Sequence, residues 1–238
     1  MPPREHRVRA DPILGPLNSD LGYSIRDSVF TQGDMDCVGR ALSVASVERT
    51  KAGARHVLKV PAVQALAADP RLIDIAREFV GSRPVPFRAT LFDKSPLANW
   101  LVVWHQDTAL PMRERITGPG WGPWSTKGGV LYAHAPAWAL EQVVALRVSL
   151  DDSTATNGPL RVLPGTHASG VLTDDEIASL AKGAPAVECV APRGGVVAMR
   201  PLTIHASSKS TEAAPRRVLH IEYARALDLG GNAVLALG

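Results

Sequence analysis

The stretch GVVAMRPLTIHASSKSTEAAPRRVLHIEYA, residues 195–224, contains two apolar runs separated by a polar segment of small residues. The runs, GVVAMRPLTIHA (195–206) and RRVLHIEYA (216–224), contain Val, Ile and Tyr, which favour strands. Similar runs precede them, bounded by Gly, Pro or Asn: FRATLFD (87–93), NWLVVWHQ (99–106), GVLYAHA (129–135), VVALRVSL (143–150), LRVLP (160–164) and AVECVA (186–191). About eight short strands in succession predict a barrel or a two-sheet jelly roll.

Helical periodicity is concentrated in the first third of the chain. Apolar residues recur at helical spacing in three segments: 34–50, 61–70 and 71–81. Before them, the weak alternation of residues 22–30 indicates one strand. Among the later strands we expect one further helix over residues 173–183, where Thr173 would cap the first turn together with Glu176 three residues on.

The bulk composition is that of an ordinary globular protein. The 238 residues are 45% hydrophobic and 21% charged, and this length suits one domain. The 26 Lys and Arg residues nearly balance the 23 Asp and Glu residues and form no long basic block, which disfavours nucleic acid as a partner. No apolar run approaches the ~20 residues of a membrane span. The first residues, MPPREHRVRADPIL, lack the apolar core of a secretory signal.

Cys37 and Cys189 are the only cysteines, and they stand far apart with no CxxC spacing. This pattern disfavours a disulfide framework or a zinc site and fits a reducing compartment. We therefore expect a soluble, cytoplasmic protein with no membrane partner, while the sequence leaves its oligomeric state open.

A histidine and an aspartate stand two positions apart in WHQDTAL, residues 104–110, directly after an apolar run. Alternate residues of a strand share one face, so His105 and Asp107 are expected to project together while Gln106 turns away. One more histidine would complete the facial triad of two histidines and a carboxylate that binds iron(II) in non-haem oxygenases. His205 is the best candidate, because it ends an apolar run and precedes small polar residues. A His-x-Asp pair alone is common by chance, so the prediction of a metal site depends on the other segments of the sequence as well.

Arg216 stands at the head of the last predicted strand, eleven residues after His205. Its guanidinium could hold a carboxylate bidentately, as a two-acid co-substrate that chelates the metal at its other end would require. The alternative is that Arg216 and Arg217 are both solvated. Strand alternation turns the two arginines to opposite faces, and we expect Arg216 to be the inward one, together with His220 and Glu222.

The sequence resembles the phytanoyl-CoA dioxygenase family over about residues 86–225. The segments that carry the resemblance follow one another in order: LFDKSP (91–96), WHQD (104–107), LRVSLDDSTATNGPLRVLPGTH (146–167), GGVVAMRPLTIHASS (194–208) and RRVLHIEYA (216–224). The N-terminal third also fits, through AGARHVLKVPAV (52–63). The resemblance implies a mainly β fold, in which a double-stranded β-helix (jelly-roll, cupin-like) core carries helical N-terminal elements. We expect a single domain over residues 1–238, with a helix-rich support (1–85), a catalytic core (86–225) and a C-terminal tail (226–238).

The family consists of iron(II)- and 2-oxoglutarate-dependent oxygenases, so the resemblance implies Fe(II), 2-oxoglutarate as co-substrate, and O₂. It implies His105, Asp107 and His205 as the catalytic iron ligands and Arg216 as the anchor for the distal carboxylate of 2-oxoglutarate. Ser207 matches a family position that commonly hydrogen-bonds this carboxylate. The implied reaction converts 2-oxoglutarate to succinate and CO₂ while a C–H bond of an unknown small organic molecule is oxidised, usually by hydroxylation.

Lys94 and Arg147 each have two interpretations. Lys94 either lines the pocket for 2-oxoglutarate or is a surface lysine at a turn. Arg147 stands in a strand where relatives often carry an aromatic residue, and a buried arginine needs a partner. It either forms a second clamp for 2-oxoglutarate or an acidic substrate, or it pairs with a carboxylate of the barrel such as Glu222.

Substrate contacts are expected from residues 108–138 and from the N-terminal elements, where Arg55 and His56 could reach the mouth of the site. The first part of that segment, residues 108–128, is a long Gly-, Pro- and Trp-rich connection typical of a lid or a disordered loop. The candidates are Trp121, Trp124, Tyr132 and His134. Alternatively, Trp121 and Trp124 pack their loop onto the barrel, and His134 is a loop histidine with its hydrogen bonds satisfied.

The sequence does not define the class of substrate. A coenzyme A thioester would require a basic patch, which the sequence does not show clearly, so a free acid, an amino acid or a secondary metabolite is equally compatible. Two alternatives remain for the function itself. One is a protein or peptide side-chain hydroxylase with the same cofactors, and the other is a catalytically silent jelly-roll binding protein.

Overall fold

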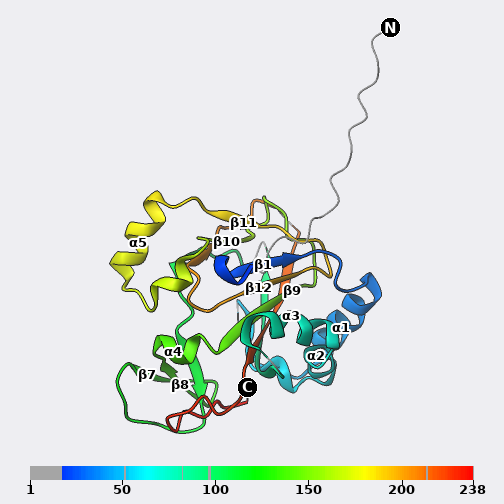
Figure 1. Cartoon of the computed structure of the whole chain (residues 1–238). Helices are drawn as coiled ribbons and strands as arrows, with labels where there is room; N and C mark the ends of the chain where they lie inside the picture. The colour runs from blue at the N-terminus through cyan, green and yellow to red at the C-terminus, as the bar shows by residue number, and fades with distance from the viewer. Residues whose placement is uncertain (1–17, 51, 82, 96–97, 213, 238) are drawn as a thin grey trace.

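The largest sheet of the fold contains seven strands and occupies the centre of the molecule (Figure 1). The computed structural model describes residues 18–50, 52–81, 83–95, 98–212 and 214–237. Within them the strand order is β1-β12-β9-β14-β4-β3-β2. The strands are β1 (Tyr23–Arg26), β2 (Arg49–Thr50), β3 (Gly53–Ala54), β4 (Val85–Lys94), β9 (Val143–Ser149), β12 (Val196–Met199) and β14 (Arg216–Ala224). Strand β9 is buried along its whole length, which explains why its sequence is a continuous apolar run rather than an alternating one.

Two smaller sheets complete the β structure, and all paired strands are antiparallel. The four-stranded sheet has the order β11-β10-β13-β5, and the three-stranded sheet has the order β6-β8-β7. Their strands are β5 (Val102–His105), β6 (Ala109–Met112), β7 (Trp124–Lys127), β8 (Val130–His134), β10 (Leu160–Val162), β11 (Val187–Cys189) and β13 (His205–Ser207). The mainly β, cupin-like fold class predicted from the sequence is confirmed.

Helices from the N-terminal third group together beside the large sheet (Figure 1). They are α1 (Gln32–Val44), α2 (Pro61–Ala67) and α3 (Pro70–Val80), and α3 packs against β9. Their buried side chains, such as Leu72, share one apolar cluster with residues of the large sheet, such as Leu146. Each fully buried side chain of this size contributes roughly 1.5–3 kcal/mol to folding. The shorter elements are η1 (Asn18–Leu21), η2 (Val57–Lys59), α4 (Ala137–Leu140), η3 (Thr166–Ser169) and α5 (Asp174–Gly183).

Helix boundaries follow local capping. Helix α5 begins after Thr173, whose side chain accepts a hydrogen bond from the backbone of Glu176, so the predicted capping box is confirmed. Helix α1, however, ends at Val44 and not at residue 50. The Arg49 guanidinium donates to the Leu42 carbonyl at 2.6 Å, which satisfies an acceptor of the last turn, and the chain then enters β2.

The apolar run 195–206 is not one strand. Strand β12 ends at Met199, a turn closed by the Thr203 N–H on the Arg200 carbonyl follows, and the chain resumes as β13 in the other sheet. Pro201 lies in this turn and cannot donate to a ladder. His205 therefore begins a strand, where the sequence pattern placed it at a strand end.

The segment 108–128 was predicted to be a lid or a disordered loop. In the structure it instead contributes β6 and β7 to the three-stranded sheet. Its tryptophans pack inward on a second apolar cluster. The C-terminal residues are attached here as well, since Leu235 forms a β-bridge with Met112. The division of the chain into support, core and tail stays a prediction.

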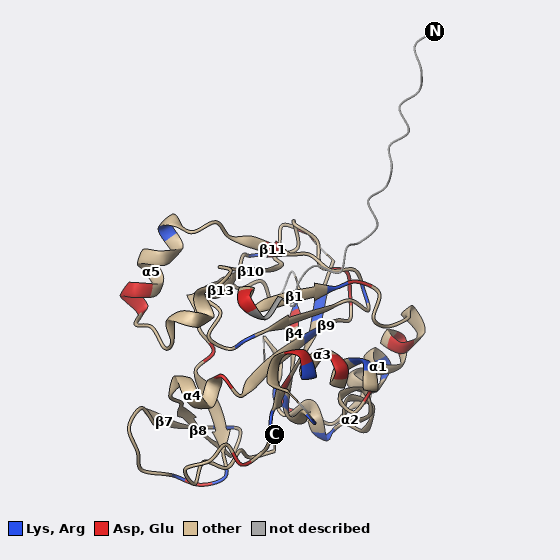
Figure 2. Ribbon diagram, in the orientation of Figure 1, with Lys and Arg blue, Asp and Glu red and all other residues tan. Residues whose placement is uncertain are grey.

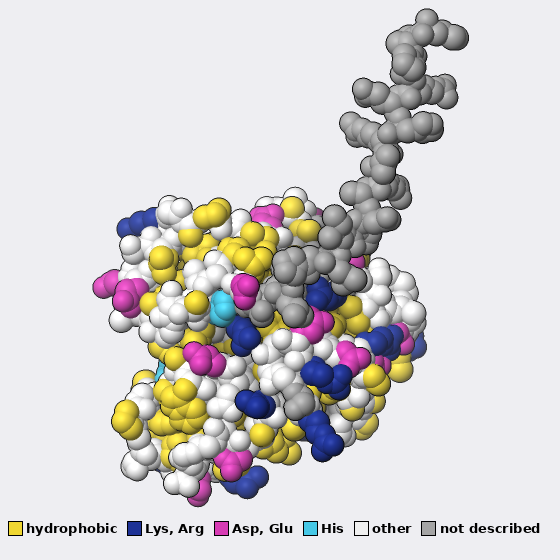
Figure 3. Space-filling model, in the orientation of Figure 1, with side chains coloured by type: hydrophobic (Ala, Val, Ile, Leu, Met, Phe, Trp, Pro, Cys, Tyr) yellow, Lys and Arg dark blue, Asp and Glu magenta, His cyan; other side chains and the backbone are white. Residues whose placement is uncertain are grey.

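Charged side chains of both signs are mixed on the face shown in Figure 3, where Lys and Arg lie beside Asp and Glu. Within the described residues, no helix has the length and apolar character needed to cross a membrane.

Candidate active site

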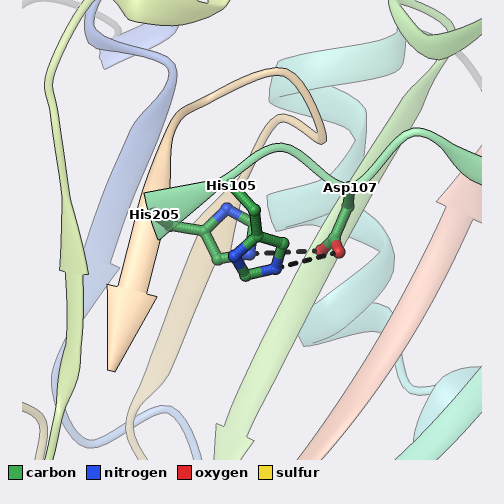
Figure 4. A group of neighbouring side chains, drawn as sticks. All are labelled: His105, Asp107 and His205. Carbon is green, nitrogen blue, oxygen red and sulfur yellow. Dashed lines mark ion pairs between the residues drawn. The ribbon is translucent and has the colours of Figure 1, made fainter. Parts of the chain in front are cut away.

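The three predicted metal ligands lie together in the structure. His105 is the last residue of β5 and stands directly opposite His205, the first residue of β13. Their ring centroids are 4.2 Å apart. The Nε2 atoms of His105 and His205 lie 3.6 and 3.4 Å from the two carboxylate oxygens of Asp107 (Figure 4). One ligand atom from each residue lies within 4.8 Å of the others, so the three could share one cation.

Asp107 reaches this position in a way that strand alternation did not predict. Strand β5 ends at His105, and Asp107 lies beyond it, with its backbone N–H donating to the Pro201 carbonyl at 2.9 Å. The turn that divides β12 from β13 therefore positions the carboxylate. Gln106 does turn away, as predicted, and its buried amide donates to the carbonyls of Gly170 and Leu202 at 2.9 and 2.8 Å.

The donor set fits a divalent metal. The Nδ1 atom of His105 lies 2.8 Å from the Val103 carbonyl, and that of His205 lies 2.9 Å from the Thr203 carbonyl. Because a carbonyl only accepts, both Nδ1 atoms carry the proton and both Nε2 lone pairs face Asp107. Burial tends to raise the pKa of the Asp107 carboxyl, but His205 and His105 outweigh it and hold that pKa well below its usual range. The site thus offers two imidazole nitrogens and an ionised carboxylate, which are the donor types of a metal site with two histidines and one carboxylate.

A cluster of buried cations lies beside these ligands. Arg216, the first residue of β14, pairs in register with Lys94, the last residue of β4, and both are buried. The Lys94 ammonium donates to the Ser207 hydroxyl at 2.9 Å and to the Ser208 carbonyl, and the Ser207 hydroxyl donates to the Gly158 carbonyl at 2.8 Å. The interpretation of Lys94 as a surface lysine is therefore wrong.

Arg216 lacks a partner for its buried Nε atom among the described residues. Burial and the charge of Arg147 lower the pKa of Arg216 to about 10. Arg217 faces the other way and pairs with Asp151 at 2.7 Å, as the alternation predicted. The inward arginine is thus an uncompensated charge beside the metal ligands, which favours an anionic ligand.

Arg147 does not pair with Glu222, so that interpretation is wrong. Glu222 instead forms a bidentate pair with Arg88, its register partner on β4. Arg147 donates to His220 Nδ1 at 3.2 Å, and burial together with Arg147 lowers the pKa of His220 to about 3. His220 therefore stays neutral, and Arg147 keeps its charge available to the pocket.

Two cavities meet at the metal ligands. The inner one, of about 130 Å³, is lined by the three ligands, the cation cluster and Ser207. The outer one, of about 270 Å³, contains Asp107 together with Tyr132 and His134. Phe92, Asp107 and His220 line both cavities and so form their boundary. The arrangement can hold a metal, an anionic co-substrate on one side and a second molecule on the other.

The predicted substrate contacts are divided by the structure. Tyr132 and His134 lie on β8 and line the outer cavity, and His134 Nδ1 lies 2.7 Å from the Thr108 hydroxyl. Trp121 packs edge-to-face on Trp138 at 6.0 Å between centroids and lines neither cavity beside the metal ligands within the described chain.

Sequence reasoning missed Arg88 and Phe92 as residues of the site. Arg88 and Phe92 lie six and two positions before Lys94 on β4, so all three side chains lie on the same face of the strand. Counting back from Lys94 in steps of two residues could have revealed them from the sequence. Figure 2 shows that Lys and Arg occur on the central strands as well as at the periphery.

Titration of Lys94 gives a first prediction. Burial, followed by the charges of Arg216 and Arg147, lowers the pKa of Lys94 to about 8. A dianionic ligand binds the protonated ammonium, so its affinity should be complete below pH 8 and decline by up to about tenfold per unit as pH rises through 8. Calorimetric titration of 2-oxoglutarate into metal-loaded protein between pH 7 and 9 measures this. Lys94→Met should bind more weakly with a flat profile, and an unchanged slope in this variant would assign the effect to another group.

Gly158 gives a second prediction. It has φ +70°, and an added Cβ would lie 2.3 Å from the Ser208 carbonyl oxygen and 3.1 Å from the Lys94 ammonium. Gly158→Ala should lower the free energy of unfolding by roughly 1–3 kcal/mol and disturb the Lys94–Ser207 contact. Gly183→Ala is the matched control, because an added Cβ there meets nothing within 4 Å. Equal denaturation midpoints for the two variants would contradict the strain argument.

Solved structures of iron- and 2-oxoglutarate-dependent enzymes share this fold. EctD from S. alaskensis, solved with 2-oxoglutarate and 5-hydroxyectoine, has a TM-score of 0.66 and 20% identity, and the match covers 86% of this chain and 72% of that one. The epimerase SnoN, solved with Fe³⁺, alpha ketoglutarate and nogalamycin RO, has a TM-score of 0.64 and 19% identity over 87% of this chain and 80% of that one. At such identities the likeness establishes the fold, that of the cupin-like 2-oxoglutarate oxygenases.

The sequence profile of the phytanoyl-CoA dioxygenase (PhyH) family matches residues 39–218, and the chain belongs to this family. L-proline trans-4-hydroxylase of Streptomyces griseoviridis is 30% identical over 185 residues, which are 66% of this chain and 60% of that protein. The chain thus spans about three fifths of the length of this curated relative.

Proposed function

We propose that this protein is an Fe(II)- and 2-oxoglutarate-dependent dioxygenase that hydroxylates a C–H bond of a small organic molecule. One observation carries the proposal: a His-Asp-His set, whose two Nε2 atoms face the Asp107 carboxylate, borders a pocket of buried cations that have no carboxylate partner among the described residues. A structural role for such a cluster would require counter-ions, because burying unpaired charge is costly.

Each residue then has a defined task. His105, Asp107 and His205 hold the metal, and the carbonyls that accept from the two Nδ1–H groups fix the imidazole orientation. Arg216 and Lys94 bind the distal carboxylate of 2-oxoglutarate, with Ser207 adding its hydroxyl.

Ferrous iron, 2-oxoglutarate and O₂ supply the oxidising chemistry, in which 2-oxoglutarate becomes succinate and CO₂ and a substrate C–H becomes C–OH.

The substrate side of the site is formed by other residues. Phe92 and His220 separate co-substrate from substrate, and the neutral imidazole of His220 keeps the Arg147 guanidinium oriented toward the inner cavity. Arg88 lines the outer cavity, and its pairing with Glu222 leaves little net charge there.

A small-molecule substrate is favoured over a protein side chain. All three strands of the sheet β6-β8-β7 supply lining residues to the outer cavity, Tyr132 and His134 among them, and the cavity has a volume of about 270 Å³, which suits a small molecule. The curated relative also acts on a free amino acid by its name. A cytoplasmic location is part of the proposal and is supported by the free thiols of Cys37 and Cys189.

The test is release of succinate from 2-oxoglutarate by iron-loaded protein under air, screened across organic acids, amino acids and acyl thioesters. Stimulation by one class, with hydroxylated product of equal amount, is the expected result. An intact ferrous–2-oxoglutarate complex that releases no succinate with or without any compound would instead favour a silent binding protein.

A further inference from the structure

A third and larger cavity adjoins the outer one. It has a volume of about 620 Å³, and apolar side chains form much of its wall, among them Leu58, Val85 and Val130. Thr50 and Arg55 line both cavities, so the two are neighbours at this point. A chamber of this size lies within the range of about 300–1,000 Å³ that is typical of ligand sites. The apolar chamber thus lies next to the cavity that contains Asp107, and Thr50 and Arg55 stand between the two.

Two cations lie at these cavities: Arg55 lines both of them, and Lys127 lines the cavity that contains Asp107. Lys127 ends β7, and the hairpin tip that follows it rests on the segment after β3, because His56 Nε2 donates to the Lys127 carbonyl at 3.3 Å. This contact joins segments distant in sequence and brings Lys127 to the cavity that Arg55 also lines. His56 adopts φ 56° to make it, a left-handed conformation that is uncommon for a residue with a side chain.

Among the described residues, these two exposed cations lack a carboxylate at ion-pair distance. Neither Arg55 nor Lys127 forms an ion pair within the part of the chain that the structure describes, whereas Arg88 in the same cavity is neutralised by Glu222. Among the residues lining the two chambers, the carboxylates are Asp107, which is committed to the metal site, and Glu48 at the apolar chamber. Burial and the charges of Arg55 and Arg88 lower the pKa of Lys127. An anion between these side chains would relieve that repulsion.

We propose that the substrate is an amphipathic organic anion whose acid group is held by Arg55 and Lys127 and whose apolar part occupies the chamber lined by Leu58, Val85 and Val130. The assignment of the reacting carbon to the Asp107 end rests on the proposed function, but the anion site itself does not. A free small amino acid would fill the cavity beside Asp107 and leave the apolar chamber empty, so the expected substrate is larger than the one named for the curated relative.

The experiment compares two fluorescent probes with the same aromatic skeleton. Anilinonaphthalene sulfonate is an amphipathic anion, and phenylnaphthylamine is its uncharged counterpart. Both are titrated into the full chain, into the double variant Arg55→Gln/Lys127→Gln, and into the control variant Arg113→Gln/Lys182→Gln, whose side chains are exposed and line none of these cavities. The dissociation constant of the anion should rise about tenfold in the double variant, since each cation at an opening contributes modestly. The neutral probe and the control should show no change.

Four results would overturn the proposal: no binding of the anion to the unaltered protein, equal binding of it by the double variant, equal weakening in the control, or loss of both probes together. Added salt should weaken the anion and not the neutral probe. The anaerobic visible band of iron(II) and 2-oxoglutarate is recorded on the same samples. Its absence would reject the proposed function while the probe comparison still decides the anion site.

Discussion

Replacing His205 with alanine is expected to abolish the visible charge-transfer band that the protein forms with iron(II) and 2-oxoglutarate in the absence of air. His205 supplies one of three ligand atoms, and its Nδ1–H is already held by the Thr203 carbonyl at 2.9 Å, so no neighbouring group replaces it. Loss of residues that merely orient a ligand typically costs 10–100-fold in metal affinity, and loss of the ligand itself should cost more than about 100-fold.

The measurement is an anaerobic titration of iron(II) at saturating 2-oxoglutarate, followed by absorbance. His134→Gln is the control, because His134 lies in the adjoining cavity and is bonded to Thr108 rather than to the metal ligands. Circular dichroism should show both variants folded. Retention of the band at normal iron concentration by the folded His205→Ala variant would remove this histidine from the ligand set.

Arg216→Gln is expected to weaken 2-oxoglutarate binding by about 100-fold or more while iron still binds. Truncating one partner of a buried, hydrogen-bonded charge pair costs about 2–5 kcal/mol in binding. The effect on folding should have the opposite sign. Arg216 is buried next to Arg147 and Lys94 without a carboxylate partner among the described residues, so its removal should leave the free energy of unfolding unchanged or raise it.

Calorimetry on metal-loaded protein measures the affinity, and urea denaturation of the ligand-free protein measures stability. Arg217→Gln is the matched control from the next position, since its guanidinium pairs with Asp151 on the other face of the strand. A destabilised Arg216→Gln variant with normal affinity for 2-oxoglutarate would show that the arginine is structural.

Local sequence patterns predicted the strands well because β9 and β14 are largely buried and rich in apolar, strand-favouring residues. The patterns failed where the amino-acid composition of a segment predicts one structure and its contacts with other strands produce another. The run 195–206 is apolar throughout, yet Pro201 and the turn around it divide it between two sheets. The segment 108–128 has the Gly and Pro content of a loop, yet it supplies β6 and β7 because β8 offers a partner for each.

The site shows the same limit. The grouping of His105, Asp107 and His205 was predictable because each stands at or just after the end of an apolar run. The partner of Glu222 was not, because it depends on the register between β4 and β14, which places Arg88 and not Arg147 at pairing distance. The meeting of Arg55 with Lys127 depends on a docking contact of His56 that no local pattern contains.

His105 and His205 belong to the four-stranded sheet, whereas Arg216 and Lys94 belong to the seven-stranded sheet. A 2-oxoglutarate molecule held at both ends would therefore act as a removable cross-link between the two layers of the sandwich, alongside the Lys94–Ser207 hydrogen bond. The thermal midpoint of the metal-loaded protein should climb with the logarithm of co-substrate concentration. Each turnover would shorten that cross-link by one carbon, because succinate has one carbon fewer than 2-oxoglutarate, and the two sheets would then be held together less firmly until the co-substrate is replaced.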